Sequence, residues 1–483
     1  MTEPGARPHF WLRPGFWRGV ARALVAGILL LLAAAVWVVV HPPSLGPVRD
    51  DLQAWVGRQL DRPVSFRGLT WAWSEGLQVR VREVRLGGPG LSAEAVHLGV
   101  AAVPLLWGEV RLRGLELVGL ELVLERDEKG RLQAGGFPVS PDRNLVFPLL
   151  ARFDRFTIRG GTLRWRDRLP AEPVALALRD WDVTIRPGDG EHGVDLFARL
   201  GEGWARVDGR LERFAQGPRG WRLAVDVTAR SLPAGALRPY LGAAGPRRLT
   251  GKLDLEGGLR GGLGGAVAAE GRAAMRELSL RWPARLRRPL EGLRAAGDFR
   301  LELSEGRRRL KWSDLEAEGP GVRASGRGEL RWGRRVGPAR LDTELRLASA
   351  ELPALRPFYQ VKALPEPAAD WLRDALVSGR LEGARLVLRG PLRRFPFPDK
   401  GGTFRVEAEV ADAHIAYRPG WPPVEALSGT LIFDRRRMIF RGEAGRVLGT
   451  RIKGLEASIH DLGARPPRLR LRGGVDLGLG EGV

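Results

Sequence analysis

The chain has 483 residues, of which 44% are hydrophobic, so it is long enough for several folded domains and too apolar for wholesale disorder. It contains no cysteine, which excludes disulfides, thiolate metal sites and cysteine nucleophiles. The net charge is +22, and only six of the 78 basic residues are lysine. The arginines are dispersed, one or two per strand-like segment, which argues against the concentrated basic patch of a nucleic-acid-binding protein.

The N-terminal region predicts a single membrane-spanning helix. Residues 23–40 contain no charge, and a helix of this length spans ~27 Å, close to the thickness of a bilayer core. A cleaved signal peptide is the alternative, but no small-residue cleavage site follows the run. Arginines precede the run, so residues 1–22 are expected to be cytoplasmic and the bulk of the chain periplasmic in a bacterium. The predicted anchor residues are Leu24, Ile28, Leu29, Leu30, Leu31, Leu32, Val36, Trp37 and Val38.

Beyond the anchor, the sequence predicts one amphipathic helix and then strands. Apolar residues recur at helical spacing from Val48 to Leu60, and the pattern ends near Arg62-Pro63. From Leu77 onward, apolar and charged residues alternate with the period of two that is typical of a half-exposed strand. The segment from Gly114 to Gly130 shifts its phase at Val118-Gly119, which predicts a bulge, and the following Asp-Glu-Lys-Gly predicts a turn.

Helical patterns are few in the rest of the chain. Val103 to Trp107 could form a single turn. Pro353 to Tyr359 and Pro367 to Ser378 predict two short helices, which we group as a helical insert at residues 351–380.

Strands that follow one another through short turns predict an antiparallel meander with one apolar face. About 30 strands ~4.8 Å apart would form a ribbon too long to stay flat, so we expect it to curl into an elongated groove. The fold class is therefore mostly β, with one N-terminal transmembrane helix and few short helices. The residues predicted to line the groove are Leu77, Val79, Val81, Leu115, Leu117, Leu120, Leu122, Leu124, Leu176, Leu178, Leu223, Val225, Val227, Leu386, Leu388, Phe404, Val406 and Val410.

No pattern of catalytic or metal-binding residues is evident. The six histidines are scattered without ligand spacing, and the sequence contains no H-E-x-x-H, G-x-S-x-G or phosphate-loop motif. We therefore expect neither enzymatic activity nor a metal or other cofactor.

Several segments resemble a known family. Asp61 to Val64, Leu77 to Val81 and Leu115 to Gly130 are similar to the N-terminal region of AsmA-like proteins. Segments within the block from Ala375 to Phe433 are similar to the central region of the YhdP branch, among them Leu388-Arg-Gly-Pro-Leu392 and Tyr417-Arg-Pro-Gly-Trp-Pro422. The resemblance implies residues 41–145 as an AsmA-like helix with strands, residues 146–350 as β-groove repeats, and residues 381–483 as a continuation of the groove.

The resemblance also implies a function. Members of this family are bridge-like carriers, held in the inner membrane by one helix, whose groove is thought to guide phospholipids across the periplasm toward the outer membrane. The implied partners are phospholipids, the inner membrane and other envelope or outer-membrane proteins, with no nucleic acid. Because family members are usually longer, we expect a short or truncated member. The alternative is a non-catalytic scaffold of the envelope with a closed β core and no lipid cargo.

Overall fold

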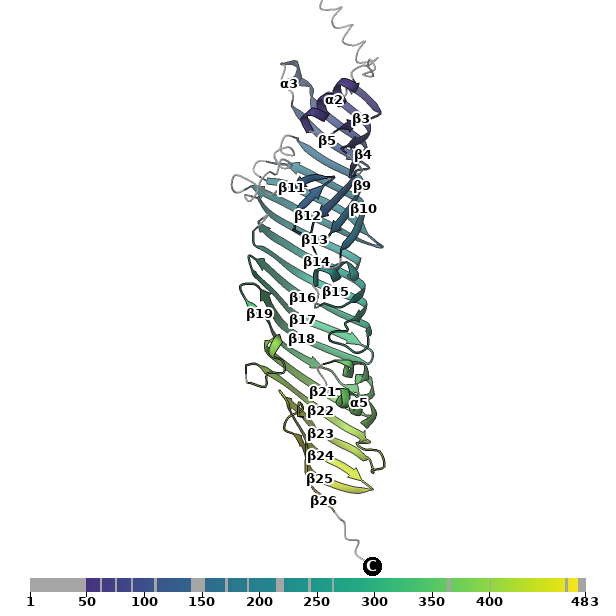
Figure 1. Cartoon of the computed structure of the whole chain (residues 1–483), viewed down its shortest axis with the longest axis vertical. Helices are drawn as coiled ribbons and strands as arrows, with labels where there is room; N and C mark the ends of the chain where they lie inside the picture. The colour runs from purple at the N-terminus through teal and green to yellow at the C-terminus, as the bar shows by residue number, and fades with distance from the viewer. Residues whose placement is uncertain are drawn as a thin grey trace, which may run out of the picture.

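The computed structural model is long and narrow, and its strands stack along the long axis (Figure 1). It describes residues 49–476, apart from 61–62, 74–75, 88–89, 108–110, 140–152, 170–172, 189–190, 214–220, 242–244, 263–264, 363–365, 400 and 465–467. Among these residues, no helix has both the length and the apolar character needed to cross a membrane. The predicted anchor, residues 23–40, lies outside the described residues.

One sheet contains all 26 strands of the described residues. Its first part comprises β1 (Val64–Ser65), β2 (Gly68–Trp73), β3 (Gly76–Leu86), β4 (Leu91–Ala101), β5 (Leu112–Val118), β6 (Glu121–Arg126), β7 (Leu132–Ala134), β8 (Phe137–Val139), β9 (Arg155–Asp167), β10 (Val174–Pro187), β11 (Glu191–Leu200), β12 (Gly203–Arg213) and β13 (Trp221–Pro233). Its second part comprises β14 (Arg248–Gly262), β15 (Val267–Arg281), β16 (Leu290–Ser304), β17 (Arg307–Gly319), β18 (Val322–Gly333), β19 (Gly337–Leu347), β20 (Ala350–Glu351), β21 (Leu376–Pro391), β22 (Thr403–Ile415), β23 (Val424–Asp434), β24 (Arg437–Val447), β25 (Thr450–Ile459) and β26 (Leu469–Asp476).

The predicted antiparallel meander is confirmed for most of the sheet. From β9 to β19 each strand pairs antiparallel with the next, and β19 then pairs with β21. From β21 to β26 the same pattern continues. The departure is near the N-terminus, where β5 and β6 both run parallel to β9. A parallel pair needs a crossover connection, and the chain between β6 and β9, which contains the β7–β8 hairpin, provides it.

The predicted bend at Val118-Gly119 and the predicted turn after it are present, and a further bulge lies at Asp180. Gly119 joins β5 to β6 with a φ of 61° and donates its N–H to the Arg159 carbonyl at 2.9 Å, so the two strands behave as one bent strand beside β9. Asp180 has a φ of 47°, at the register shift between β10 and β11. In the predicted turn, the Asp127 carboxylate accepts hydrogen bonds from the N–H groups of Lys129 and Arg131.

The short helices follow the sequence patterns, with two corrections. They are α2 (Arg49–Leu60), α3 (Ala102–Leu106), the 3₁₀ helices η5 (Ala234–Leu241), η6 (Leu352–Gln360) and η7 (Leu392–Arg394), and α5 (Glu366–Ala375). Helix α5 ends three residues before the predicted Ser378, because Leu376 already pairs with Ile415 in the sheet. The sequence analysis did not predict η5, whose Pro and Gly residues obscure any helical period, or the three-residue η7.

Bulges recur along the sheet and bend it. Left-handed backbone conformations at Ser231, Glu277, Asp314 and Asp412 coincide with register shifts in their strands. A bulge bends a strand and increases its twist, so repeated bulges curve a long sheet. Buried apolar side chains form three small clusters among the described residues, around Leu381, Ile158 and Leu249.

Candidate functional site

One face of the sheet carries an uninterrupted row of apolar and glycine residues from β2 to β22. Residues directly opposite one another on paired strands point to the same face, so the register identifies the members of the row. They are Leu69, Val81, Val96, Leu117, Ile158, Val183, Leu196, Val207, Val227, Gly257, Gly271, Phe299, Trp312, Gly328, Thr343, Leu388 and Phe404. Only Thr343 is polar, and its hydroxyl donates a hydrogen bond to the Arg327 carbonyl at 2.9 Å.

A second apolar row runs beside the first, two residues away on each strand. From β2 to β21 it contains Trp71, Val79, Leu98, Leu115, Phe156, Ile185, Val194, Gly209, Val225, Leu259, Ala269, Leu301, Leu310, Leu330, Leu341 and Gly390. Two parallel rows of this length make a continuous apolar stripe along the sheet. We call this side of the sheet the apolar face.

The structure brings all eighteen predicted lining residues to the apolar face. Leu388 and Val227 belong to the first row, and Val79, Leu115 and Val225 to the second. The others follow from the same alternation and registers: Leu178 pairs with Leu200 beside a bulge in β10, and Val410 pairs with Leu381 beside a bulge in β21. Only two of the eighteen are fully buried, Leu120 and Val225, each with 6% of its surface exposed. The rest are half-buried, as expected for a face that is partly shielded but not closed by a second layer.

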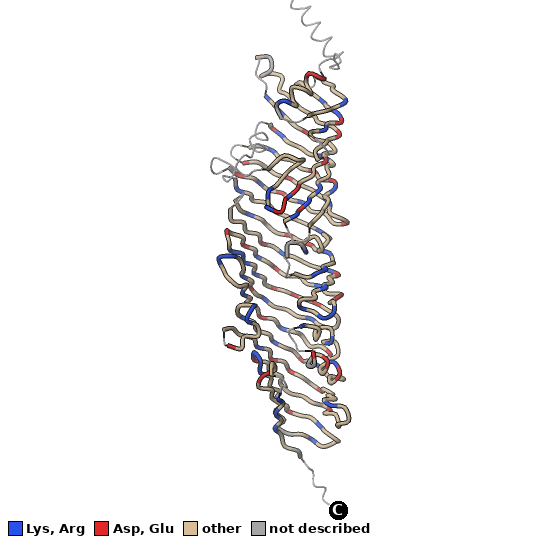
Figure 2. The backbone as a smooth tube through the Cα atoms, viewed as in Figure 1, with Lys and Arg blue, Asp and Glu red and all other residues tan. Residues whose placement is uncertain are grey.

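The opposite side, which we call the charged face, is covered by ion pairs. Along the strands, charged residues alternate with uncharged ones (Figure 2). Opposed positions on neighbouring strands carry Asp195, Asp208, Asp226, Gly258, Glu270, Arg300, Lys311, Glu329, Asp342 and Arg389. Arg300 pairs with Glu270 at 2.6 Å and Arg389 with Asp342 at 3.3 Å. This side is therefore adapted to contact with water.

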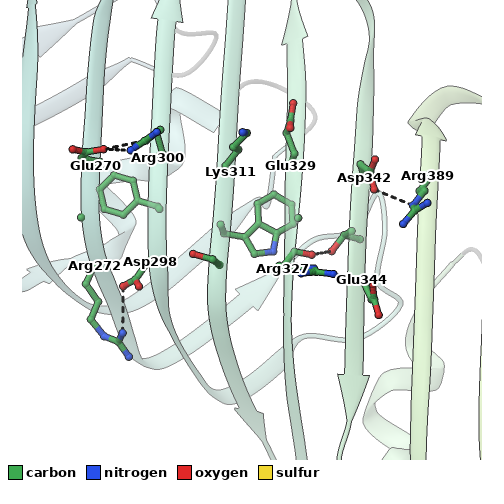
Figure 3. Close-up of a pocket in the computed structure, with 16 residues that line it drawn as sticks. Glu270, Arg272, Asp298, Arg300, Lys311, Arg327, Glu329, Asp342, Glu344 and Arg389 are labelled. Carbon is green, nitrogen blue, oxygen red and sulfur yellow. Dashed lines mark hydrogen bonds and ion pairs between the residues drawn. The ribbon is translucent and has the colours of Figure 1, made fainter.

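A hollow of about 800 Å³ lies over β15 to β21 (Figure 3). Two rows of charged side chains line it, one containing Arg300 and Lys311 and the other Asp298 and Arg327. The strand segment between these rows, including Phe299, contributes the floor, and the next apolar residues on either side are absent from the lining. The hollow therefore opens on the charged face. Its five basic and five acidic residues balance, so it has no net charge to attract an ion.

Aromatic side chains on the apolar face lie over glycines. A Cβ on Gly328 would come within 2.3 Å of the Trp312 ring, so the indole covers the position where a side chain would stand. The indole Nε1–H of Trp312 is buried and finds no hydrogen-bond partner among the described residues. The sequence analysis missed this pairing of ring and glycine, because it depends on the register of two strands.

Two titratable sites have shifted pKa values that bear on stability. His192 lies on the apolar face, opposite Leu211, and burial lowers its pKa. On the charged face, the hydrogen bond from Arg309 lowers the pKa of Glu329, and burial opposes this only partly. Within the described ranges, no group of three or more histidine or acidic residues is placed to hold a metal ion.

Comparisons with known proteins find similarity to two families. Residues 258–478 match the family model for the YhdP protein, and residues 18–134 match the model for the AsmA family. The chain is thus similar to YhdP/AsmA-like proteins over two separate regions. The Intermembrane phospholipid transporter YhdP of Escherichia coli is 26% identical over 104 residues, which cover 22% of this chain and 8% of that relative. No solved structure matches the chain.

The two family matches cover different parts of the sheet, and neither includes β9 to β13. The AsmA match includes β1 to β7, and the YhdP match begins within β14 and extends beyond the end of β26. Both rows of the apolar face continue from β5, in the AsmA-matched region, through β9 to β13 and into β14. The region between the matches therefore continues the same surface.

Proposed function

We propose that this protein carries phospholipids along its apolar face, with the acyl chains against the sheet and the headgroups in water. The observation that carries the proposal is the row of apolar residues and glycines, with Thr343 as its one polar member, that runs from Leu69 to Phe404. The matches to the YhdP and AsmA families, and to a relative named as an intermembrane phospholipid transporter, support it. On this proposal, the chain is anchored in the inner membrane and acts in the periplasm between the two membranes of the envelope.

The physical need for such a face is large. Exposing a 16-carbon acyl chain to water costs ~12 kcal/mol at about 0.8 kcal/mol per CH₂ group, and a phospholipid has two such chains. The Leu, Val, Ile, Phe and Trp side chains of the two adjacent rows offset much of this cost along the sheet. Neighbouring positions then have similar affinity, which favours sliding over tight binding. No bond is made or broken, so the proposal requires no catalytic residue.

The half-buried state of the apolar face favours lipid carriage over the scaffold alternative. In a closed sandwich the inward residues of two sheets interlock and become fully buried. Here Leu386, Leu388, Phe404 and Val406 remain half-buried, and none of them belongs to a buried cluster around Leu381, Ile158 or Leu249. The apolar face therefore has surface left for a ligand.

Lipid co-purification tests the proposal with a matched pair of variants. Leu388 lies on the apolar face, whereas Val387 lies on the charged face between Glu344 and Arg405. Leu388→Glu should reduce the phospholipid that co-purifies with the full chain by about tenfold or more, because an ionised group on the apolar face must be desolvated by each passing chain. Val387→Glu should leave it unchanged. Equal lipid content in the two variants, measured by mass spectrometry after purification in mild detergent, would favour the scaffold alternative.

A further inference from the structure

Three segments whose sequences contain no acidic residue come together where β14 begins, β15 ends and β16 begins. Residues 227–253, 278–290 and 352–365 contain no Asp or Glu. The Arg247 N–H donates to the Arg281 carbonyl at 2.7 Å, and the Lys362 N–H donates to the Arg285 carbonyl at 2.7 Å. Segments far apart in the sequence thus bring their basic residues to the same place. We name Arg247, Arg248, Arg281, Arg285, Arg288 and Lys362 the cationic corner.

Two of these arginines oppose each other directly. Arg248 on β14 is the register partner of Arg281 on β15. The next pair, Leu249 and Leu280, belongs to an apolar cluster, so the two arginines project from the charged face. Like charges at directly opposed positions of a sheet are destabilising. A bound anion would offset the repulsion between the two guanidinium groups.

No acidic side chain neutralises the cationic corner within the part of the chain that the structure describes. All six of its side chains are exposed, and none forms an ion pair there. Basic residues nearby on the same strands differ: Arg276 pairs with Asp254 at 2.9 Å, and Lys252 approaches Glu202 at 3.8 Å. The corner is thus a concentrated positive charge, unlike the balanced hollow.

The backbone under the cationic corner is held in place. The N–H groups of Arg285 and Leu286 donate to the Trp282 carbonyl at 2.8 and 2.7 Å, which closes a tight turn. Leu286 is buried and forms a β-bridge with Val361, and the Arg287 guanidinium donates to the Val361 carbonyl at 3.0 Å. The cations are therefore presented on a rigid support, which reduces the entropy lost on binding.

We propose that the cationic corner binds the phosphate group of an anionic phospholipid. Guanidinium groups hold phosphate through paired, charge-assisted hydrogen bonds, and several unpaired arginines at one place fit this chemistry. The apolar residues Leu278, Leu280 and Leu293 lie on the apolar face of the same strands, at the same edge. A lipid held by its phosphate at the corner could place its acyl chains on that face. This inference deepens the proposed function and rests on it for the lipid as the source of the phosphate.

Calorimetry on the full chain in detergent tests the inference, with dihexanoyl phosphatidylglycerol and inorganic phosphate as separate probes at constant ionic strength. The test variant replaces Arg248, Arg281, Arg285 and Arg288 with glutamine. The control variant replaces four other arginines with glutamine. They are exposed and have no ion pair within the described residues: Arg186, Arg260, Arg340 and Arg441. Both variants lose the same net charge. The test variant should bind the short-chain lipid about tenfold or more weakly than the control, because charge-assisted hydrogen bonds are lost.

The two probes separate the possible sources of the phosphate. Tighter binding of the lipid than of inorganic phosphate supports a headgroup site, whereas equal binding would assign the corner to free phosphate and overturn the lipid inference. Arg281→Gln alone should raise Tm without ligand, since it removes the repulsion from Arg248, and should lower lipid affinity. Equal losses of lipid affinity in the test and control variants would refute the proposed phosphate site at the cationic corner. Retention of co-purified lipid by the test variant would leave the carriage proposal intact, and loss of co-purified lipid in Leu388→Glu alone would not affect the corner.

Discussion

Replacing Asp167 with asparagine should lower the free energy of local opening at the parallel junction of β6 and β9 by about 2–4 kcal/mol. The Asp167 side chain is fully buried and opposes Arg126 across that junction. Its carboxylate accepts a hydrogen bond from Arg126 Nε at 2.8 Å and another from the Leu169 N–H at 3.0 Å. Breaking a buried ion pair costs about 3–5 kcal/mol when the remaining charge stays dry. Here 26% of the Arg126 side chain is exposed, so water recovers part of its hydration and the lower range applies.

Hydrogen exchange on the full chain measures this effect where it arises, since it reports local opening free energies. Amides of β6 and β9 should lose protection in Asp167→Asn, whereas those of β22 to β24 should not change. Asp195→Asn is the control, because Asp195 contacts Arg206 at 3.4 Å on the solvent-exposed charged face. Exposed pairs contribute about 0–1 kcal/mol, so the control should change little. Equal loss of protection in both variants would refute the reasoning that burial makes the Asp167 pair important.

Three further outcomes follow from particular contacts. Gly328→Ala should lower the free energy of unfolding by about 1–3 kcal/mol, because the new Cβ displaces the Trp312 ring. Gly258→Ala is the control, since its Cβ meets nothing closer than 3.4 Å and the free energy of unfolding should not change. Urea unfolding of the two variants measures the difference. Burial lowers the pKa of His192 from 6.5, so the unfolded chain protonates first and Tm should fall as the pH drops below about 6.5, a slope that His192→Gln should reduce. The pKa of Glu329 is lowered by Arg309, so its contribution is present above about pH 4.5 and is lost as the pH falls through its folded pKa; Glu329→Gln should flatten acid unfolding there.

Local features of the fold were predictable from sequence because they depend on neighbouring residues. The alternation of Leu115 and Leu117 with charged residues predicts a strand, and the phase shift at Gly119 predicts the bend that joins β5 to β6. At Asp180, a bulge likewise keeps Leu178 on the apolar face. Since each bulge preserves the facing of its strand, residues that share the apolar face could be named before the pairing was known.

Long-range features could not be predicted in this way. The parallel pairing of β9 with β5 and β6 depends on where the chain returns after its crossover, and no local pattern encodes that. The stacking of Trp312 over Gly328 depends on register. The cationic corner could not be predicted from the sequence either, because it depends on a long-range contact. The arginines of residues 278–290 approach Lys362 through the bridge between Leu286 and Val361.

The most direct test of the central claim is photo-cross-linking from the sheet to lipid in intact cells. A benzophenone amino acid would replace Leu388 in one variant of the full chain and Val387 in another. These neighbours share a strand and lie on opposite faces. Lipid carriage along the apolar face predicts phospholipid adducts at position 388 and none at position 387. Equal adducts at both positions, or adducts at position 387 alone, would contradict it.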